Sequence, residues 1–372
     1  MHHDLIVVGG GPVGASLARA VRDLSVVLLA RERRVPEVRT EGRFDARVYA
    51  LSPANVAFLG LDARDLTAVH AMRVFGDAGA RIEFDAYRAG VPALAYIVED
   101  AELQNALWRG LEVEIGHCEG LAVEHDCVRV RLDGGRELAA KLVVAADGAQ
   151  SRIRDFAGIP AAVKAYGQSA VVANFACERP HRNTAYQWFQ RGPVLALLPL
   201  PGNHVSMVWS LPEGEAARIA GLEPAELAAE VQAASQGALG AFSVVTQPRT
   251  YALRRLSARR MVAPRVALVG DAAHVIHPLA GQGLNLGLQD ARSLSRVLAE
   301  REPTRDAGDW RLLRRYERSR AEPILAMDTM VDGLYRFFGA KGAFAAGLRN
   351  RGLNLTDRLE VVKNLLIRQA MN

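Results

Sequence analysis

A glycine-rich turn near the start of the chain restricts the possible folds more than any other feature. The turn, Gly9-Gly10-Gly11-Pro12-Val13-Gly14, follows an apolar strand pattern over residues 4–8 and precedes apolar residues at helical spacing over residues 15–22. A second apolar strand pattern covers residues 26–30. In this context Gly9, Gly11 and Gly14 let the backbone and the helix N-terminus approach a pyrophosphate. The sequence therefore predicts an α/β fold with a Rossmann-like domain that binds a dinucleotide.

An acidic residue about 20 positions beyond such a turn accepts hydrogen bonds from the ribose. Glu32 lies 32 − 14 = 18 positions beyond Gly14 and is the expected ribose contact, with Arg33 beside it as a second cofactor contact. The apolar pattern stops at Ala30, so a shorter helix would place Ala30 at the usual acidic position. Glu32 and Ala30 therefore both remain possible occupants of the ribose-binding position.

Two later segments also combine a buried-type strand with a polar turn. Asp147-Gly148 follows the strand pattern of residues 141–146, although an aspartate in a plain turn would also bind nearby N–H groups. Gly270-Asp271 follows apolar residues 265–269, and Gly281-Gln282-Gly283 then opens a helix pattern that begins with Leu284 and Asn285. A helix N-terminus has unpaired N–H groups that can face an anion. With the first turn, these segments predict one FAD held at three places along the chain.

The rest of the pattern predicts a second, sheet-rich region. Residues 72–75 and 81–84 predict one hairpin, and the alternating residues 128–132 ahead of Asp133-Gly134-Gly135 predict another. Strand candidates between residues 170 and 256 predict a mostly antiparallel sheet, and residues from about 284 onwards have a helical pattern. The expected domains are a Rossmann-like FAD-binding domain (1–70, 96–162 and 262–330), a substrate-binding β-sheet domain that interrupts it (71–95 and 163–261) and a helical C-terminal region (331–372).

Composition limits the classes of function. The chain has 372 residues, 50% of them hydrophobic and 23% charged, with a net charge of +5. No basic block is interleaved with aromatic residues, so nucleic-acid binding is not expected. No apolar run approaches the roughly 18 residues that span a bilayer, and the first strand pattern leaves no room for a signal peptide. Three cysteines without CxxC spacing predict neither disulfides nor a thiolate metal site, so we expect a cytoplasmic protein.

Five segments carry a resemblance to a known family. They are IVVGGGPVGA at residues 6–15, DARVYALS at 45–52, ADGAQSRIR at 146–154, GPVLALLPL at 192–200 and HPLAGQGLNLGLQD at 277–290. Over nearly its whole length the chain resembles the class A flavoprotein monooxygenases and, within them, the ubiquinone-biosynthesis hydroxylase family. The resemblance implies the p-hydroxybenzoate hydroxylase fold, FAD as cofactor, and NAD(P)H or another reductant as electron donor.

The resemblance also implies roles for single residues. Arg47 would reach the phosphate or ribityl region, Asp271 would bind the ribityl hydroxyls, and Asp147 would contact both FAD and the nicotinamide cofactor. Asp100 departs from the pattern, because related flavin hydroxylases often have Arg or Gln there. The full set of expected cofactor-binding residues is Gly9, Gly11, Pro12, Val13, Gly14, Glu32, Arg33, Arg47, Asp147, Gly270, Asp271, Pro278, Gly281, Gly283, Leu284 and Asn285.

The implied reaction needs few catalytic side chains. Reduced flavin would react with O2, form a C4a-hydroperoxide and transfer OH to an electron-rich phenol, here a polyprenylated intermediate of ubiquinone biosynthesis. The loop of Pro278, Gly281, Gln282 and Gly283 is expected beside the ring, where backbone N–H groups and the helix N-terminus stabilise the anionic reduced flavin. His274 and His277 fit no HExxH metal pattern, so no metal is expected, and no side-chain base is assigned.

Other functions stay open on the sequence alone. A flavin hydroxylase of a soluble aromatic acid would pair the substrate carboxylate with a cation such as Arg182 or Arg191. A non-catalytic flavoprotein subunit of a lipid-synthesis complex would share the cofactor site. A flavin-dependent halogenase is not expected, because its Trp-x-Trp-x-Ile-Pro element is absent from the sequence.

A lipophilic substrate raises two further questions. Four apolar residues of the expected sheet either line an access groove or belong to the core: Leu195, Leu197, Leu198 and Trp209. The aromatic and basic residues 334–339 would touch the inner membrane surface, an oligomer partner or the cofactor domain. The expected partners are a lipophilic phenol and O2, with other ubiquinone-biosynthesis enzymes, a membrane surface and a second copy of the chain as open alternatives.

Overall fold

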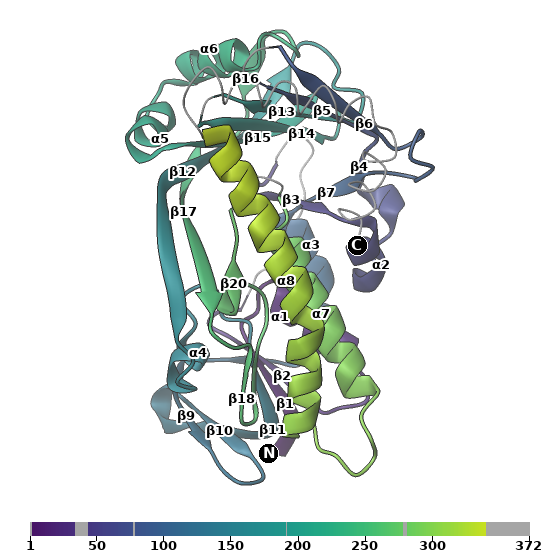
Figure 1. Ribbon diagram of the computed structural model, residues 1–372, viewed down its shortest axis with the longest axis vertical. Coiled ribbons are helices and arrows are strands. Elements are labelled where there is room, and N and C mark those ends of the chain that lie inside the picture. The colour runs from purple at the N-terminus through teal and green to yellow at the C-terminus, as the bar shows by residue number, and fades with distance from the viewer. Residues whose placement is uncertain (1, 34–43, 77–78, 191, 278–280, 340–372) are drawn as a thin grey trace. The chain divides into compact units, whose positions relative to one another are not determined.

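The computed structural model describes residues 2–33, 44–76, 79–190, 192–277 and 281–339 (Figure 1). The chain divides into two compact units, each assembled from separate stretches of sequence. Unit 1 contains residues 1–37, 101–164 and 254–330, and unit 2 contains residues 38–100, 165–253 and 331–372. Residues 38–70 therefore group with the sheet-rich unit, whereas the sequence analysis assigned them to the FAD-binding domain. That domain assignment stays a prediction.

Unit 1 is built on a largely parallel sheet. Its strand order is β18-β19-β11-β1-β2-β8, and the hairpin β9–β10 extends it beside β11. The contacts of β1 with β11 and β2, of β2 with β8 and of β11 with β19 are parallel, whereas β18 and β10 pair antiparallel. The strands are β1 (His2–Val8), β2 (Val26–Ala30), β8 (Val113–Ile115), β9 (Cys118–Val123), β10 (Val128–Leu132), β11 (Glu137–Ala145), β18 (Val262–Ala263) and β19 (Val266–Leu268).

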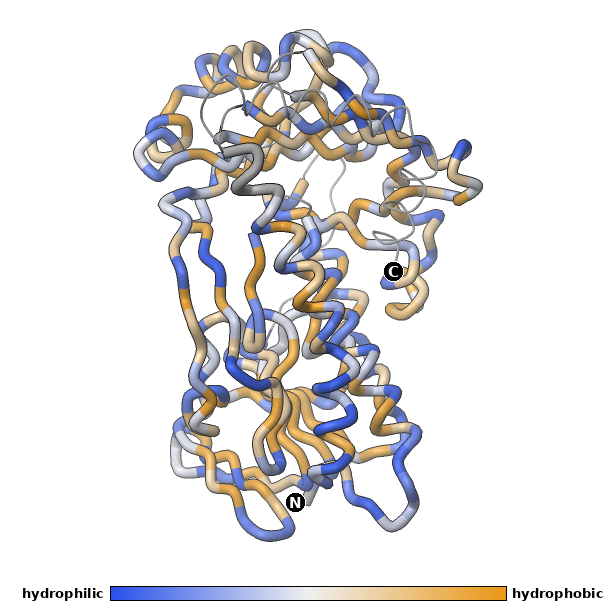
Figure 2. Tube along the Cα trace, viewed as in Figure 1, coloured by the Kyte–Doolittle hydropathy of each residue, from blue (hydrophilic) through white to orange (hydrophobic). Residues whose placement is uncertain are grey.

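The central strands of this sheet are continuously apolar because both of their faces are covered. Leu5, Ile6 and Val7 of β1 are fully buried, as are Leu142 and Val143 of β11. Figure 2 shows these strands as runs of hydrophobic residues. The βαβ order expected at the N-terminus is confirmed, with α1 (Pro12–Ala20) between β1 and β2.

Helix α7 (Gly283–Ala299) and the residues of α8 (Trp310–Gly339) up to Met330 complete unit 1. α7 packs against α1, and Ser293 of α7 is hydrogen-bonded to Ser319 of α8 at 2.7 Å. The Tyr316 hydroxyl donates to the carbonyl of Leu268 at 2.8 Å, which fixes the first turns of α8 to β19. Two shorter helices, α3 (Asp100–Trp108) and α4 (Arg152–Phe156), follow β7 and β11 along the chain.

Unit 2 contains the mostly antiparallel sheet that the sequence predicts. β12, β15, β14 and β13 follow one another antiparallel, β5 pairs parallel with β13, and β6 closes the hairpin with β5. The strands are β5 (Ala71–Phe75), β6 (Arg81–Asp85), β12 (Ala161–Cys177), β13 (Thr184–Phe189), β14 (Val194–Leu200), β15 (His204–Pro212), β16 (Phe242–Val244) and β17 (Arg249–Ala258). β12 and β17 each begin in one unit and end in the other.

Helices α5 (Glu213–Ala220) and α6 (Pro224–Ala234) cover one face of this sheet (Figure 1). Leu195, Leu197 and Trp209 lie in the apolar core under these helices, with Ile219 and Leu227 from the helices themselves. The core alternative is therefore confirmed for these three sheet residues, and an access groove along them is wrong. Strand alternation places Leu198 on the opposite face, where it packs against Leu200 and Val69.

A small sheet of order β3-β7-β4 belongs to the same unit. Its strands are β3 (Val48–Leu51), β4 (Thr67–Val69) and β7 (Ala95–Glu99), and α2 (Pro53–Leu59) follows β3. Asp45, which precedes β3, accepts through its backbone carbonyl a 2.7 Å hydrogen bond from the side-chain amide of Asn174 on β12. In the ranges that the structure describes, no helix combines the length and apolar character needed to cross a membrane.

Candidate functional site

The glycine turn between β1 and α1 is fixed by direct backbone packing. A Cβ atom at Gly9, whose φ is +118°, would lie 2.2 Å from the carbonyl oxygen of Ala146. A Cβ at Gly14 would lie 2.0 Å from the carbonyl oxygen of Gly9. Real Cβ atoms do not come this close to backbone, so only glycine lets α1 start here. The turn thus brings the first expected segment against the residue that precedes Asp147.

The N-terminus of α1 is left open. Gly11 is its N-cap, Pro12 is its first residue, and among the described residues no side chain caps it. A Cβ at Gly11 would meet nothing within 4 Å, so the space in front of the helix is not filled by the neighbouring protein atoms that the structure describes. Such an arrangement suits a phosphate group, because the N–H groups of the first turn point outwards along a positive helix end.

Trp108 holds the other side of the same turn and was missed by the sequence analysis. Its Nε1 donates to the carbonyl of Gly10 at 2.8 Å, and a Cβ at Gly10 would lie 2.5 Å from its ring. The signal in the sequence is a large indole side chain at the end of the helical pattern of residues 100–108.

Asp147 caps α4 in the structure. Its Oδ2 accepts hydrogen bonds from the backbone N–H groups of Arg152 at 2.8 Å and Ile153 at 3.3 Å. Burial raises the pKa of Asp147, while hydrogen bonds from Ser151 and from the backbone oppose that rise. The local-turn alternative therefore describes what this side chain does here, and contact with FAD or a nicotinamide cofactor stays a prediction.

The Gly270-Asp271 segment forms the 3-10 turn η3 (Gly270–Ala272) directly after β19. A Cβ at Gly287 of α7 would lie 2.8 Å from Val13 Cγ2 and 3.0 Å from Gly270 Cα. Val13 of the first turn, Gly270 of η3 and Gly287 of α7 therefore pack together. Asp271 is exposed at this junction.

Arg154 joins η3 to the segment that follows Asp147. Its Nη1 donates to the carbonyls of Ala149 and Ala272, both at 3.1 Å, and the residue is 6% exposed. Three of the segments that the sequence analysis selected, at residues 9–14, 147–149 and 270–272, are thus connected inside unit 1.

The remaining predicted segment, Gly281-Gln282-Gly283, lies at the start of α7. Gly281 has a φ of +61°, Gln282 is the N-cap, and the helix begins at Gly283, one residue before the expected start. Among the described residues no side chain caps α7. Leu284 is half-buried and Asn285 is buried. Pro278 lies outside the described residues.

Two further predicted contacts follow β2 in unit 1, and a third belongs to unit 2. Glu32 and Arg33 are exposed just beyond β2, which ends at Ala30, so neither alignment of the acidic position is decided. Arg47 belongs to unit 2, where its guanidinium lies 5.1 Å from the ring centre of Tyr49 and 5.8 Å from that of Tyr251. These are cation–π distances.

Asp100, the departure from the family pattern, has a local partner. Its Oδ1 accepts a 3.0 Å hydrogen bond from the hydroxyl of Tyr49. The Asp–Tyr pair explains how a carboxylate is accommodated at the start of α3.

The two histidines of the segment differ in their surroundings. Burial lowers the pKa of His277 to about 4, so this ring is neutral at pH 7. His274 is buried, and its Nε2 lies 2.6 Å from the carboxylate of Asp290 on α7. A paired His274 was not foreseen, although Asp290 offered a signal: it stands midway between Leu286 and Leu294 on the apolar stripe of a helix, where a carboxylate requires a partner.

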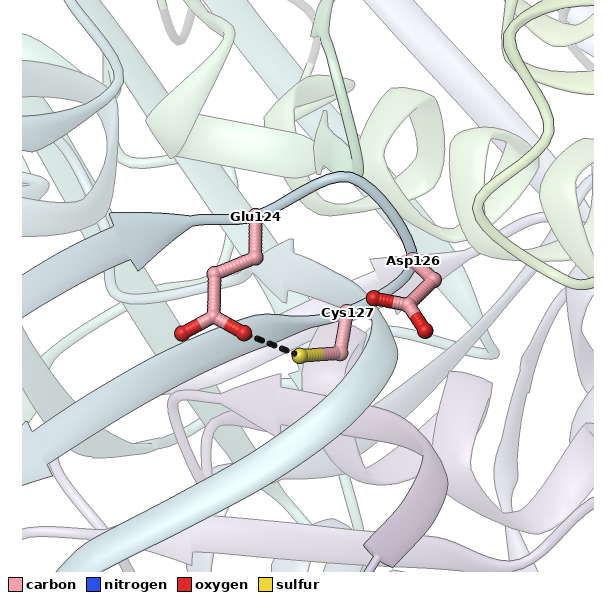
Figure 3. Close-up of side chains that lie close together, drawn as sticks. All are labelled: Glu124, Asp126 and Cys127. Atoms are coloured by element: carbon pink, nitrogen blue, oxygen red, sulfur yellow. Dashed lines mark hydrogen bonds between the residues drawn. The ribbon is translucent and has the colours of Figure 1, made fainter.

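A second cluster of titratable groups lies in the β9–β10 turn (Figure 3). The Cys127 thiol donates to Glu124 Oε2 at 3.0 Å, and Glu124 Oε1 accepts from Arg129 Nε at 2.7 Å. The bond to Glu124 and burial raise the pKa of Cys127, which disfavours the thiolate that metal binding needs. With Asp126 exposed beside them, these groups close a hairpin by ordinary hydrogen bonds.

Comparison with known proteins identifies the family of this chain. The FAD binding domain family matches residues 105–328. The 3-demethoxyubiquinol 3-hydroxylase of Escherichia coli (strain K12) is 33% identical over 99% of this chain and 98% of that protein. The chain belongs to the ubiquinone-biosynthesis hydroxylase family. It is an FAD-dependent monooxygenase.

Further similarities agree with this family. Ubiquinone hydroxylase UbiL of Rhodospirillum rubrum is 31% identical over 99% of this chain and 89% of that protein. The crystal structure of HpxO from Klebsiella pneumoniae, complexed with FAD and uric acid, has the same fold, with a TM-score of 0.76 and 20% identity over 100% of this chain and 97% of that one. The sequence-based predictions of the fold and of FAD as cofactor are confirmed for this flavoprotein monooxygenase.

Proposed function

We propose that this hydroxylase adds an OH group to the ring of a polyprenylated phenol on the route to ubiquinone. The observation that carries the proposal is the 33% identity, over nearly the full length of both chains, with an enzyme named for hydroxylating a demethoxyubiquinol. The low aromatic content and the apolar sheet do not discriminate between substrates, so the substrate assignment depends on this relative.

The geometry of unit 1 supports a specific way of holding FAD. We assign the pyrophosphate to the open N-terminus of α1, where Gly9, Gly11 and Gly14 keep side chains out of the way. Asp271, exposed where Val13, Gly270 and Gly287 pack together, would accept hydrogen bonds from the ribityl hydroxyls. The adenosine ribose is assigned to Glu32 and Arg33, the second pyrophosphate contact to Pro12 and Val13, and further contacts to Arg47, Asp147, Leu284 and Asn285.

FAD supplies a ring that, once reduced, reacts with O2 and delivers one oxygen atom to an electron-rich substrate ring. The protein's part is to stabilise charge and exclude water. The uncapped N-terminus of α7, reached through Gly281, Gln282 and Gly283, is suited to the negative charge of the reduced ring. Pro278, which lacks an N–H group, would line the oxygen-accessible side.

The remaining elements of the proposal are the electron donor, the partners and the location. NAD(P)H is the proposed donor, so each turnover would consume O2 and NAD(P)H and release water with the hydroxylated product. Residues 71–95 and 163–261 are proposed as the substrate-binding domain. The enzyme would act in the cytoplasm, at the inner face of the membrane that holds its substrate, beside other enzymes of the route.

The test is a comparison of substrates with purified holoenzyme. We expect NADH or NADPH oxidation coupled to O2 uptake with a short-chain prenylated phenol, and a product heavier by one oxygen atom in mass spectrometry. A soluble aromatic acid serves as the control and should not be hydroxylated. Hydroxylation of the acid alone would contradict the proposal and favour a flavin hydroxylase of a soluble aromatic acid, in which Arg182 or Arg191 pairs with the substrate carboxylate.

A further inference from the structure

Asp290 of α7 is a fully buried carboxylate that lies directly behind η3. We propose that Asp290, His274 and Arg320 form a positioning network that presents Asp271 to the ribityl chain of FAD and so sets the affinity for the cofactor. This inference rests on the proposed function, because it takes Asp271 as an FAD contact.

The network surrounds one carboxylate with three donors. Asp290 Oδ2 accepts from the backbone N–H of Gly270 at 2.9 Å and lies 2.6 Å from His274 Nε2. Asp290 Oδ1 accepts from Arg320 Nε at 2.7 Å. An ionised carboxylate has only acceptors, so His274 must donate through Nε2. The ionised form of Asp290 can accept all three hydrogen bonds.

The environment keeps Asp290 in that form. Burial alone would raise the pKa of Asp290, but His274, Arg320 and the Gly270 N–H group together lower it below its ordinary value. Arg320 is also buried and donates through Nη2 to Gln289 at 3.2 Å and to the carbonyl of Leu286 at 3.3 Å. Arg320 is thus hydrogen-bonded to the Asp290 carboxylate and to two further groups of α7.

The anchored atom is the N–H of the residue that precedes Asp271. Gly270 has a φ of +59°, in the left-handed region that favours glycine, and a Cβ there would lie 3.3 Å from Val13 Cγ2. The hydrogen bond to the Gly270 N–H therefore holds the residue from which the chain enters Asp271. The carbonyl at the other end of η3, on Ala272, is held by Arg154. Asp271 lies between two anchored backbone groups, which restricts the directions that its carboxylate can take.

The contributions come from three elements that are far apart in the sequence. His274 follows η3, Asp290 lies on α7 and Arg320 lies on α8. α8 is itself held to β19 by Tyr316. α8 contains none of the residues expected to contact FAD. It would act on the cofactor through Arg320, the counter-ion of Asp290.

The experiment measures FAD binding to apo-protein by quenching of flavin fluorescence, with far-UV circular dichroism and thermal unfolding of each apo-protein as the folding check. Asp290→Asn keeps the shape but removes the charge, and His274→Leu removes the donor. We expect each to raise the dissociation constant for FAD about tenfold or more, the size of one lost hydrogen bond to a charged group. His274→Gln, whose side-chain amide can still donate, should stay within about threefold of the wild type.

Asp306→Asn is the matched control. Asp306 pairs with the partly buried Arg265 in unit 1, at 3.1 Å, and its side chain has no recorded contact with η3. It should change the melting temperature of the apo-protein without changing FAD affinity. If folded Asp290→Asn and His274→Leu bind FAD within about twofold of the wild type while Asp271→Asn is weakened, the network does not position the turn and the inference is overturned.

A different result separates the inference from the proposed function. If Asp271→Asn itself binds FAD as tightly as the wild type, the assignment of Asp271 to the cofactor fails, and the positioning role fails with it. Should Asp290→Asn not fold, the pair His274→Leu and His274→Gln still decides, since a loss in the first with retention in the second supports the network and equal affinities overturn it.

Discussion

The two turns proposed to hold FAD are fixed by different forces. The glycine turn of residues 9–14 is held by backbone atoms in van der Waals contact with Ala146 and by the indole of Trp108. The turn η3 is held by the buried charges of Asp290 and Arg154. Close packing is insensitive to pH and salt, whereas a buried carboxylate depends on its counter-ions. Mutations and acid should therefore affect the two turns differently.

The largest effect is expected from removing the counter-ion of η3. Arg320→Met keeps much of the side-chain volume but leaves the buried Asp290 without its guanidinium partner. Breaking a buried pair from one side costs about 3–5 kcal/mol. We expect this loss in the free energy of unfolding measured by urea denaturation. A loss below about 1 kcal/mol would show that charge does not hold η3.

Acid should act on the segment after η3 and spare the glycine turn. The pKa of His277 falls from 6.5 in the unfolded chain to about 4 in the folded one, so the unfolded chain binds more protons between these values. Stability is full above pH 6.5 and is lost as the pH falls towards 4. The loss amounts to about 3 kcal/mol for this group. His277→Gln should flatten the pH dependence of unfolding in this window, and an unchanged slope would contradict the buried neutral ring.

The packing of the first turn is tested by a pair of glycine substitutions. Gly14→Ala forces a methyl group against the carbonyl of Gly9 and should cost about 2–3 kcal/mol. Gly11→Ala adds the same group to open space, so thermal unfolding of the apo-protein should change little, while FAD affinity falls because the pyrophosphate is expected there. Equal destabilisation by both variants would contradict the close-packing account.

The smallest expected effect comes from Trp108. Trp108→Phe removes the hydrogen bond to the carbonyl of Gly10 but keeps an aromatic ring against the turn. One such bond is worth about 1 kcal/mol. Urea unfolding should show a loss of this size, at equal extent at pH 5 and pH 8, since no titrating group takes part. A marked pH dependence would mean that the first turn is also held by charge.

The sequence predicted the first turn better than the second for a physical reason. Gly9 has a positive φ and Gly14 packs against the Gly9 carbonyl within the same turn, so the spacing of these glycines carries much of the information. Asp290 is paired with residues 16 positions before it and 30 positions after it, and only the folded chain brings them together. Periodicity identifies Asp290 as an odd residue on an apolar stripe, but it does not name His274 or Arg320.

The sheet of unit 2 shows the same limit. The strand candidates expected between residues 170 and 256 include β14 and β15, and both strands exist. The strand pattern did not reveal which face would be covered, so a groove and the core both stayed open for Leu195 and Trp209. The helices α5 and α6 decide the question, and their position depends on contacts with residues far away in the sequence. The cap that Asp147 provides for α4 likewise became evident only from the folded chain, while its contact with FAD stays a prediction.

The tie between Arg320 and Asp290 also bears on when the cofactor can be taken up during protein synthesis. The glycine turn and η3 are complete in the nascent chain once residue 272 has been made, but the buried carboxylate gains its guanidinium partner only after residue 320 has left the ribosome. Under the proposed positioning role, stable loading of the flavin would come at the last stage of translation, and shortened versions of the chain intended to carry FAD would need to extend past that arginine.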